Sequence, residues 1–310
     1  MINLVMSNLK RWLPIIALSL LLGACQDSPK PPAADQSLTA SPSGDTLLLA
    51  VHPYDTPSRI ESRFRPLCDY LGARLGRPVT LYLAHSYGDQ IRRISHGQVD
   101  LAYMGPTPYL RAHDHYLKDA ATNDLPILAG ETLQGVIGFR SVIVALKNGP
   151  VRSLNDLRDR TLAFGDHRSF GSHYMPRALL WKAGLTLADL KDYAYLGRHE
   201  RVALAVVHGD FDAGGLREDV ARLYLDRGLR IIAESPLLPP HVIVARPGLA
   251  PSVTDALRAA LLEPDANAIP AFAALGPGTG FSQVDDLAFQ TARETIRAFE
   301  AAPPQGITLQ

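Results

Sequence analysis

The chain has 310 residues, with 31 Lys and Arg balanced by 31 Asp and Glu, and 46% of it is hydrophobic. A chain of this length and composition forms a globular body of one large domain or two ordinary ones. Zero formal charge gives no general attraction to polyanions, so no nucleic-acid partner is expected. Two cysteines cannot build a disulfide framework or a four-thiolate metal site.

The first 24 residues have the organisation of a bacterial lipoprotein signal peptide. Lys10 and Arg11 precede the apolar run LPIIALSLLL, which is too short to span a bilayer. The run ends in LGAC, which resembles a lipobox with Cys25 as the lipidated residue. The alternative is an ordinary signal peptide followed by a coincidental cysteine. In lipoproteins of this kind Gln26 suggests sorting to the outer membrane of a Gram-negative cell.

Residues 25–44 are rich in Pro, Ser and Ala and lack apolar periodicity, so they are expected to form a flexible tether rather than part of a core. With Cys25 lipidated, Cys68 has no partner for an intrachain disulfide. Cys68 lies among apolar residues of a predicted helix and is expected to be a buried, unreactive side chain.

From Leu47 onward, short apolar runs alternate with amphipathic stretches. LLLAVHP, PVTLYLAHS and VDLAYMG are separated by helical patterns, and TLAFGD, YAYLG and FDAGGL repeat the arrangement later. Such alternation predicts βαβ units in mainly parallel sheets, and therefore an α/β fold.

Two β-branched segments, 139–147 and 241–247, stand between the αβ blocks. They predict two crossovers, with residues 45–140 and 238–310 forming lobe 1 and residues 141–237 forming lobe 2. A cleft between two lobes joined in this way closes on a ligand by hinge motion. Two sequential independent domains are the alternative, but the final segment has too few strands for a sheet of its own.

Five blocks of the sequence, in order, resemble the periplasmic binding proteins for phosphonate, phosphite and phosphate that serve ABC importers. The most specific are GQVDLAYMGPTPY and FGDHRSFGSHYMP, and the resemblance extends from about Leu47 to Leu261. It implies the two-lobed type II binding-protein fold, an oxyanion ligand between the lobes and an ABC permease as partner.

The block FGDHRSFGSHYMP joins a predicted strand to a predicted helix. Backbone N–H groups at such a helix start suit an oxyanion, and Ser169 or Ser172 could add a hydroxyl donor. The simpler interpretation is a serine N-cap. Where the family usually has Ser-Thr-Ser-Gly, this chain has Ser169, Phe170, Gly171 and Ser172, so two hydroxyl donors are missing. Arg168 could replace them with a forked cation or could be a solvated surface residue.

The resemblance implies further cleft residues. Tyr87 matches a tyrosine whose phenol faces the ligand, Phe139 replaces a family tyrosine, and His199 matches a histidine that donates to the anion. Members that take aminoalkylphosphonates hold the amine with two acids; Asp219 matches the first of these positions, with Glu218 beside it, and His241 replaces the second. A cationic ligand tail is therefore disfavoured.

Tyr103 and Thr107 flank the end of the strand VDLAYM, where α/β folds place ligands, and form a second tier of candidates. No nucleotide-binding, hydrolase or zinc-protease motif is present, so no cofactor, metal or catalysis is expected. His113 and His115 point apart on a helix and lack a third ligand.

These observations predict a membrane-anchored, monomeric binding protein for a phosphonate-, phosphite- or phosphate-like oxyanion. A module of the same fold that reports to a sensor kinase is the first alternative. A small hydrolase using Ser169, His199 and Asp212 is the second. The apolar substitutions leave the ligand open, including an organic anion larger than phosphate.

Overall fold

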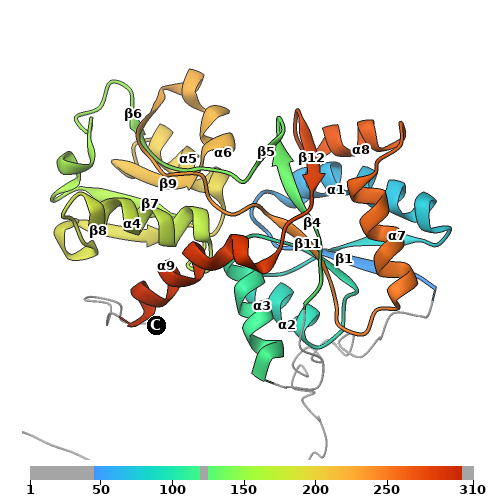
Figure 1. Ribbon diagram of the computed structural model, residues 1–310. Coiled ribbons are helices and arrows are strands. Elements are labelled where there is room, and N and C mark those ends of the chain that lie inside the picture. Colours follow the sequence, from blue (N-terminus) through green and yellow to red (C-terminus); the bar gives the residue numbers. More distant parts are fainter. Residues whose placement is uncertain (1–44, 119–124, 302–310) are drawn as a thin grey trace, which may run out of the picture. The chain divides into compact units, whose positions relative to one another are not determined.

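The computed structural model describes residues 45–118 and 125–301, which build two sheets with helices on both faces of each (Figure 1). The predicted signal peptide, the tether and Cys25 lie outside the described residues. Both sheets belong to one compact unit. No helix among the described residues is long and apolar enough to cross a bilayer.

The larger sheet has the strand order β12-β4-β11-β3-β1-β2, with β5 paired to β4. Its strands are β1 (Leu47–Val51), β2 (Val79–Leu83), β3 (Leu101–Met104), β4 (Ile127–Leu133), β5 (Val136–Ile137), β11 (Val242–Ala245) and β12 (Thr279–Ser282). The helices packed on it are α1 (Pro57–Leu75), α2 (Tyr87–Ser95), α3 (Pro106–Lys118), α7 (Pro251–Leu262), α8 (Ala268–Leu275) and α9 (Gln290–Ala301).

The smaller sheet has the order β10-β6-β9-β7-β8. Its strands are β6 (Ser141–Leu146), β7 (Thr161–Phe164), β8 (Asp192–Tyr195), β9 (Ala213–Arg217) and β10 (Leu229–Glu234). One face carries α4 (Met175–Lys182) and the other carries α5 (His199–Val207) and α6 (Glu218–Arg222). The helix predicted from about Ser172 begins instead as one turn of π-helix, η3 (Phe170–Tyr174), before α4.

The sequence predicted that the strands pair mainly in parallel, and this is wrong for several strands of each sheet. β1, β2 and β3 pair in parallel, as do β7, β8 and β9, because a helix returns the chain between them. β6, β10 and β11 flank the crossovers and pair antiparallel, as do β4, β5 and β12. The sheets are therefore mixed.

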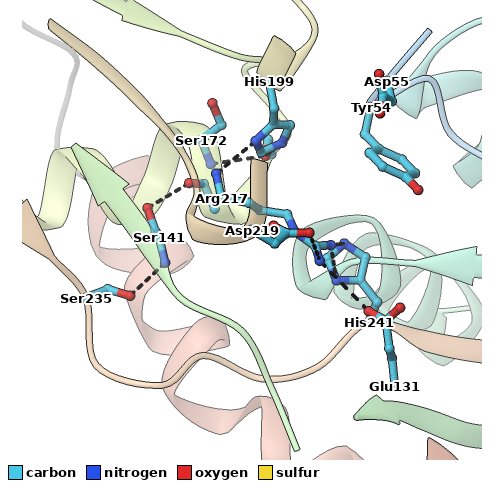
Figure 2. Close-up of polar contacts among 12 residues, drawn as sticks. Tyr54, Asp55, Glu131, Ser141, Ser172, His199, Arg217, Asp219, Ser235 and His241 are labelled. Carbon is cyan, nitrogen blue, oxygen red and sulfur yellow. Dashed lines mark hydrogen bonds and ion pairs between the residues drawn. The ribbon is translucent and has the colours of Figure 1, made fainter. Parts of the chain in front are cut away.

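The chain passes between the sheets twice, and the two passages lie side by side. The N–H of Phe139 donates to the carbonyl of Leu238 (3.3 Å), and the N–H of Leu238 donates back (2.8 Å). Farther along, the N–H of Ser141 donates to Ser235 Oγ at 2.9 Å (Figure 2). The lobe boundaries that we predicted fall on these paired segments and remain a prediction.

The sequence of helix α1 explains how this helix packs on the larger sheet and where it begins and ends. Its apolar residues recur every three to four positions, so one face is buried against the larger sheet. Pro57 opens the helix, and Gly76 ends it with φ of 64°, a left-handed value that favours glycine. Cys68 is buried on this face, and burial raises the pKa of its thiol to about 12, so the thiolate is not formed at neutral pH.

Candidate functional site

A pocket lies where the carboxyl ends of strands from both sheets meet the first turns of helices. The residues that line it are His52, Tyr54, Tyr87, Gly105, Pro106, Pro108, Phe139, Ser169, Phe170, Gly171, His199, Arg217 and His241. Helices α2, α3 and α5 begin at or beside it, as does η3. Helix starts present N–H groups that have no partner within the helix, so they favour an anion.

The first turn of η3 is built around Ser169, which is buried. Its Oγ accepts the N–H of Ser172 at 3.1 Å, as an N-cap does. The Ser169 carbonyl accepts the N–H groups of His173 and Tyr174. Phe170 and Gly171 supply the first N–H groups of this turn and both line the pocket. This strand-to-helix turn can therefore present backbone donors and one hydroxyl to a bound oxyanion.

His199 is the first residue of α5 and is buried. Its Nδ1 accepts the backbone N–H of Arg217 at 3.0 Å, so the proton of the neutral ring is on Nε2. Burial, together with the charge of Arg217, lowers the pKa of His199 to about 3. The ring is therefore a neutral N–H donor at physiological pH, and Nε2 lies 3.4 Å from Ser169 Oγ.

This tautomer argues against a serine-hydrolase role. A catalytic histidine must accept the serine proton at a free nitrogen while a carboxylate holds its other N–H. In this site Nε2 carries the proton, and Nδ1 faces a backbone donor instead of an acid. Asp212 accepts hydrogen bonds from Thr161 N–H and Oγ1, both at 2.9 Å, and so supports a strand rather than His199.

Tyr87 begins α2 and lies against His52, with 4.3 Å between the ring centroids. Burial raises the pKa of Tyr87, so its hydroxyl stays protonated and can donate. His52 is fully buried, and burial lowers its pKa to about 3. Among the described residues its Nδ1 has no hydrogen-bond partner. The wall formed by Tyr87 and His52 is therefore polar but uncharged.

Arg217 at the end of β9 is the charged centre of the pocket, although its side chain is only 11% exposed. Its Nε and Nη2 donate to the two carboxylate oxygens of Asp219 at 2.9 and 3.0 Å (Figure 2). Its Nη1 lies 3.1 and 3.2 Å from the ring nitrogens of His241. The guanidinium carbon lies 5.1 Å from the centroid of the Phe139 ring, a cation–π distance.

A second carboxylate, Glu131 of β4, approaches the same guanidinium, with 4.0 Å between Glu131 Oε2 and Arg217 Nη2. It accepts a hydrogen bond from Tyr103 Oη at 2.8 Å. Burial raises the pKa of Glu131, an effect that the charge of Arg217 opposes. The Tyr103 ring in turn stacks on His241 at 5.1 Å. Tyr103 therefore supports the pocket from behind and does not line it.

Phe139 and Gly171, two of the positions where this chain lacks a hydroxyl-bearing residue of the family, are in contact with each other. A Cβ atom on Gly171 would lie 2.7 Å from Cε2 of Phe139, closer than packed carbon atoms approach. The Phe139 ring thus occupies the space over Gly171, and a serine there would collide with it. Phe170 lines the pocket and also belongs to the apolar cluster on the larger sheet that includes Met104, Tyr109 and Leu238.

Several candidate residues do not face the pocket. Arg168 lies beside Gly88 in a separate hollow near Arg111 and Glu300, because the turn directs its side chain outward. Ser172 Oγ accepts the N–H of Gly165 and donates to the Gly215 carbonyl, so it has no donor for a ligand. Neither Arg168 nor Ser172 lines the pocket in this structure, and their roles toward a ligand remain predictions.

Three further candidates lie around the pocket without lining it. Glu218 pairs with Arg222 on α6 and faces away. Thr107 is buried beneath the start of α3, and its Oγ1 has no partner among the described residues. Asp219 reaches the pocket only through Arg217. Tyr87, Phe139, Ser169, Phe170, Gly171, His199 and His241 are brought together, and their roles toward a ligand remain predictions.

The sequence analysis missed His52, Tyr54, Glu131 and Arg217. His52 and Tyr54 directly follow β1, and Arg217 ends β9. The rule that ligands bind at the carboxyl ends of strands, which selected Tyr103, would have selected these three as well. Glu131 lies within an antiparallel strand, where no such rule applies.

The part of the chain that the structure describes contains no candidate metal centre. No group of three or more His, Cys, Asp or Glu side chains there could hold an ion. His113 lies 3.9 Å from Asp114 and 4.0 Å from Asp286, both marginal ion-pair distances.

Residues 49–289 match the family model described as "ABC transporter, phosphonate, periplasmic substrate-binding protein". The phosphate-import protein PhnD of Mycolicibacterium smegmatis is 28% identical over 264 residues, which cover 80% of this chain and 79% of that protein. PhnD1 of Prochlorococcus marinus, solved with methylphosphonate, has a TM-score of 0.75 at 20% identity and covers 83% of this chain and 98% of its own.

A binding-protein component of a Pseudomonas aeruginosa ABC phosphonate transporter has a TM-score of 0.71 at 21% identity, with coverage of 85% of this chain and 91% of its own. These likenesses confirm the predicted α/β type II binding-protein fold.

Proposed function

The chain belongs to the periplasmic substrate-binding proteins of phosphonate ABC transporters, and we propose that its pocket captures a phosphonate-, phosphite- or phosphate-like oxyanion. Membership makes the chain a periplasmic component that takes a small molecule and serves a permease. The observation that carries the finer proposal is the convergence of Ser169 Oγ, the Nε2–H of His199 and the first turn of η3 on one buried point. These are neutral, preorganised donors, which suit a compact anion.

Capture requires the walls of the pocket to move. The space left free in it is about 10 Å³, which is roughly the room needed by one water molecule. Contacts across the cleft hold it in this form: His199 N–H donates to the Tyr54 carbonyl at 3.3 Å, and Arg59 pairs with Glu200 at 3.3 Å. We infer that the two sheets separate to admit the ligand and close over it.

The test is thermal unfolding of the full chain with methylphosphonate, phosphite, phosphate, sulfate and acetate. A ligand present at a hundredfold its Kd stabilises the folded state by about 2.7 kcal/mol. At least one phosphorus oxyanion should therefore raise the Tm by several degrees, while acetate leaves it unchanged. A Tm that responds to none of the phosphorus compounds would refute the proposed ligand class.

We further propose that the chain is a monomeric lipoprotein held at the membrane through Cys25, with Gln26 directing it to the outer membrane. The support is the sequence Leu-Gly-Ala-Cys after a basic and apolar leader. Radiolabelled palmitate supplied to the cells should be incorporated into the wild-type protein and not into Cys25→Ser. Equal labelling of the two proteins, or no labelling of the wild type, would contradict lipidation at Cys25.

A further inference from the structure

The pocket holds a positive charge of its own at the place where a charged ligand tail would meet acids. Asp219 and Glu131 are the two carboxylates at this end of the pocket, and both face the guanidinium of Arg217. Asp219 is bound by two parallel N–H donors, the geometry in which arginine binds carboxylates most strongly. From inside the pocket, a cationic group on a ligand would meet Arg217 before either acid, because Arg217 lines the pocket and neither acid does.

The surroundings keep Arg217 where it is. Burial penalises its charge, yet the carboxylates of Asp219 and Glu131 raise its pKa well above the usual value. Phe139 and His241 contact the guanidinium from other directions. An arginine that is largely buried and held by two carboxylates and two rings is a fixed part of the wall, not a mobile surface side chain.

The backbone and the side chain of Arg217 act on different parts of the pocket. Its N–H fixes the tautomer of His199 beside Ser169, at the donor cluster proposed for the oxyanion. Its side chain passes Gly171 of η3 and extends to Asp219, His241 and Phe139. A side-chain substitution therefore changes the charge at the tail end and leaves the backbone donor in place.

We propose that Arg217 is the specificity-determining residue of this pocket. It provides, from the protein itself, the positive charge that an aminoalkyl tail would bring with the ligand. The site therefore selects oxyanions whose substituent is small and carries no positive charge. The inference rests on the proposed function. The sequence disfavoured an amine because an acid seemed to be missing. The structure contains two acids: Arg217 binds Asp219 through two hydrogen bonds and lies 4.0 Å from Glu131.

The experiment measures Kd by calorimetry for methylphosphonate, 2-aminoethylphosphonate and phosphonoacetate on the full chain. The wild type should bind methylphosphonate roughly tenfold or more tightly than 2-aminoethylphosphonate. Arg217→Met, which exposes Asp219 and Glu131, should shift that ratio by at least tenfold toward the aminoalkyl ligand. The double variant Arg217→Met with Asp219→Asn should lose most of the gain.

Asp219→Asn alone is the second variant to test, because it removes the carboxylate that neutralises the charge of Arg217. It should weaken 2-aminoethylphosphonate further and favour phosphonoacetate, whose tail is anionic. This opposite shift keeps the proposal testable if Arg217→Met does not fold. Arg201→Met is the matched control, because Arg201 is exposed on α5 and does not line the pocket; its ratios should equal those of the wild type.

Equal or tighter binding of 2-aminoethylphosphonate by the wild type would overturn the proposal. So would Arg217→Met or Asp219→Asn variants that fold but keep the wild-type ratios, since Arg217 would then be merely structural. A loss of all three ligands by the same factor in Arg217→Met would show that Arg217 contacts the oxyanion itself. If the wild type bound no phosphorus oxyanion, the proposed function would fail first, and the two failures are thus distinguishable.

Discussion

The free energy of unfolding should fall by several kcal/mol when the pH is lowered from 7 to 5 in the absence of ligand. His52 and His199 are fully buried, and burial lowers the pKa of each to about 3; that of His173 is lowered to about 4. In the unfolded chain a histidine has a pKa near 6.5. Below that pH these histidines are protonated in the unfolded chain but remain neutral in the folded protein. The free energy of unfolding therefore decreases as the pH falls from the unfolded pKa toward the folded pKa.

Each such histidine contributes a slope of about 1.4 kcal/mol per pH unit, or about 2 kcal/mol at pH 5. Glu131 acts in the opposite direction, because burial raises its pKa in the folded state and the folded protein gains stability as that carboxyl is protonated. Burial also lowers the pKa of His241 well below its usual value, so one acid opposes four histidines and the net slope stays positive. Four such contributions together approach the whole stability of an ordinary domain.

Urea unfolding at half-unit pH steps measures this slope directly. His52→Asn should reduce it by about 1.4 kcal/mol per pH unit, because one buried imidazole is gone. His208→Asn is the control, since His208 is exposed at the end of α5. An unfolding free energy that stayed level between pH 7 and pH 5 would mean that these histidines are hydrated in the folded protein.

The sequence predicted where the pocket lies better than it predicted which side chains form it. The turn at Ser169 and the helix start at His199 were recognisable because strand-to-helix junctions have local signatures in Gly, Ser and His. The two passages between the sheets were recognisable as β-branched segments between αβ blocks. In each case neighbouring residues carry the information.

The pairing of Arg217 with Glu131 could not be recognised in the same way, although the strand-end rule selects the position of Arg217. Their significance lies in a contact between β9 and β4, strands of different sheets, and the sequence around Arg217 reads as an arginine beside two acids. The same limit applies to Phe139 and Gly171, which are separated by 32 positions yet exclude each other's side chains. The antiparallel pairing was missed because periodicity gives the existence of a strand but not its direction.

Replacing His199 by Asn should weaken binding of methylphosphonate roughly 10- to 100-fold while leaving the protein folded. The Asn carbonyl can take the place of Nδ1 and accept the Arg217 N–H, but its short side chain presents no donor where Nε2–H lies. Losing one hydrogen bond to a charged ligand costs about 1.5–3 kcal/mol, which gives that range of affinity.

His199→Gln is the matched variant, because its longer amide can place an N–H near the Nε2 position. It should bind more tightly than His199→Asn while losing the Nδ1 contact to Arg217. Calorimetric Kd values and Tm for both variants separate the two roles of the ring. If His199→Asn bound as tightly as the wild type, or if both variants lost affinity only in proportion to lost stability, His199 would be a structural residue. The oxyanion would then depend on Ser169 and the backbone of η3.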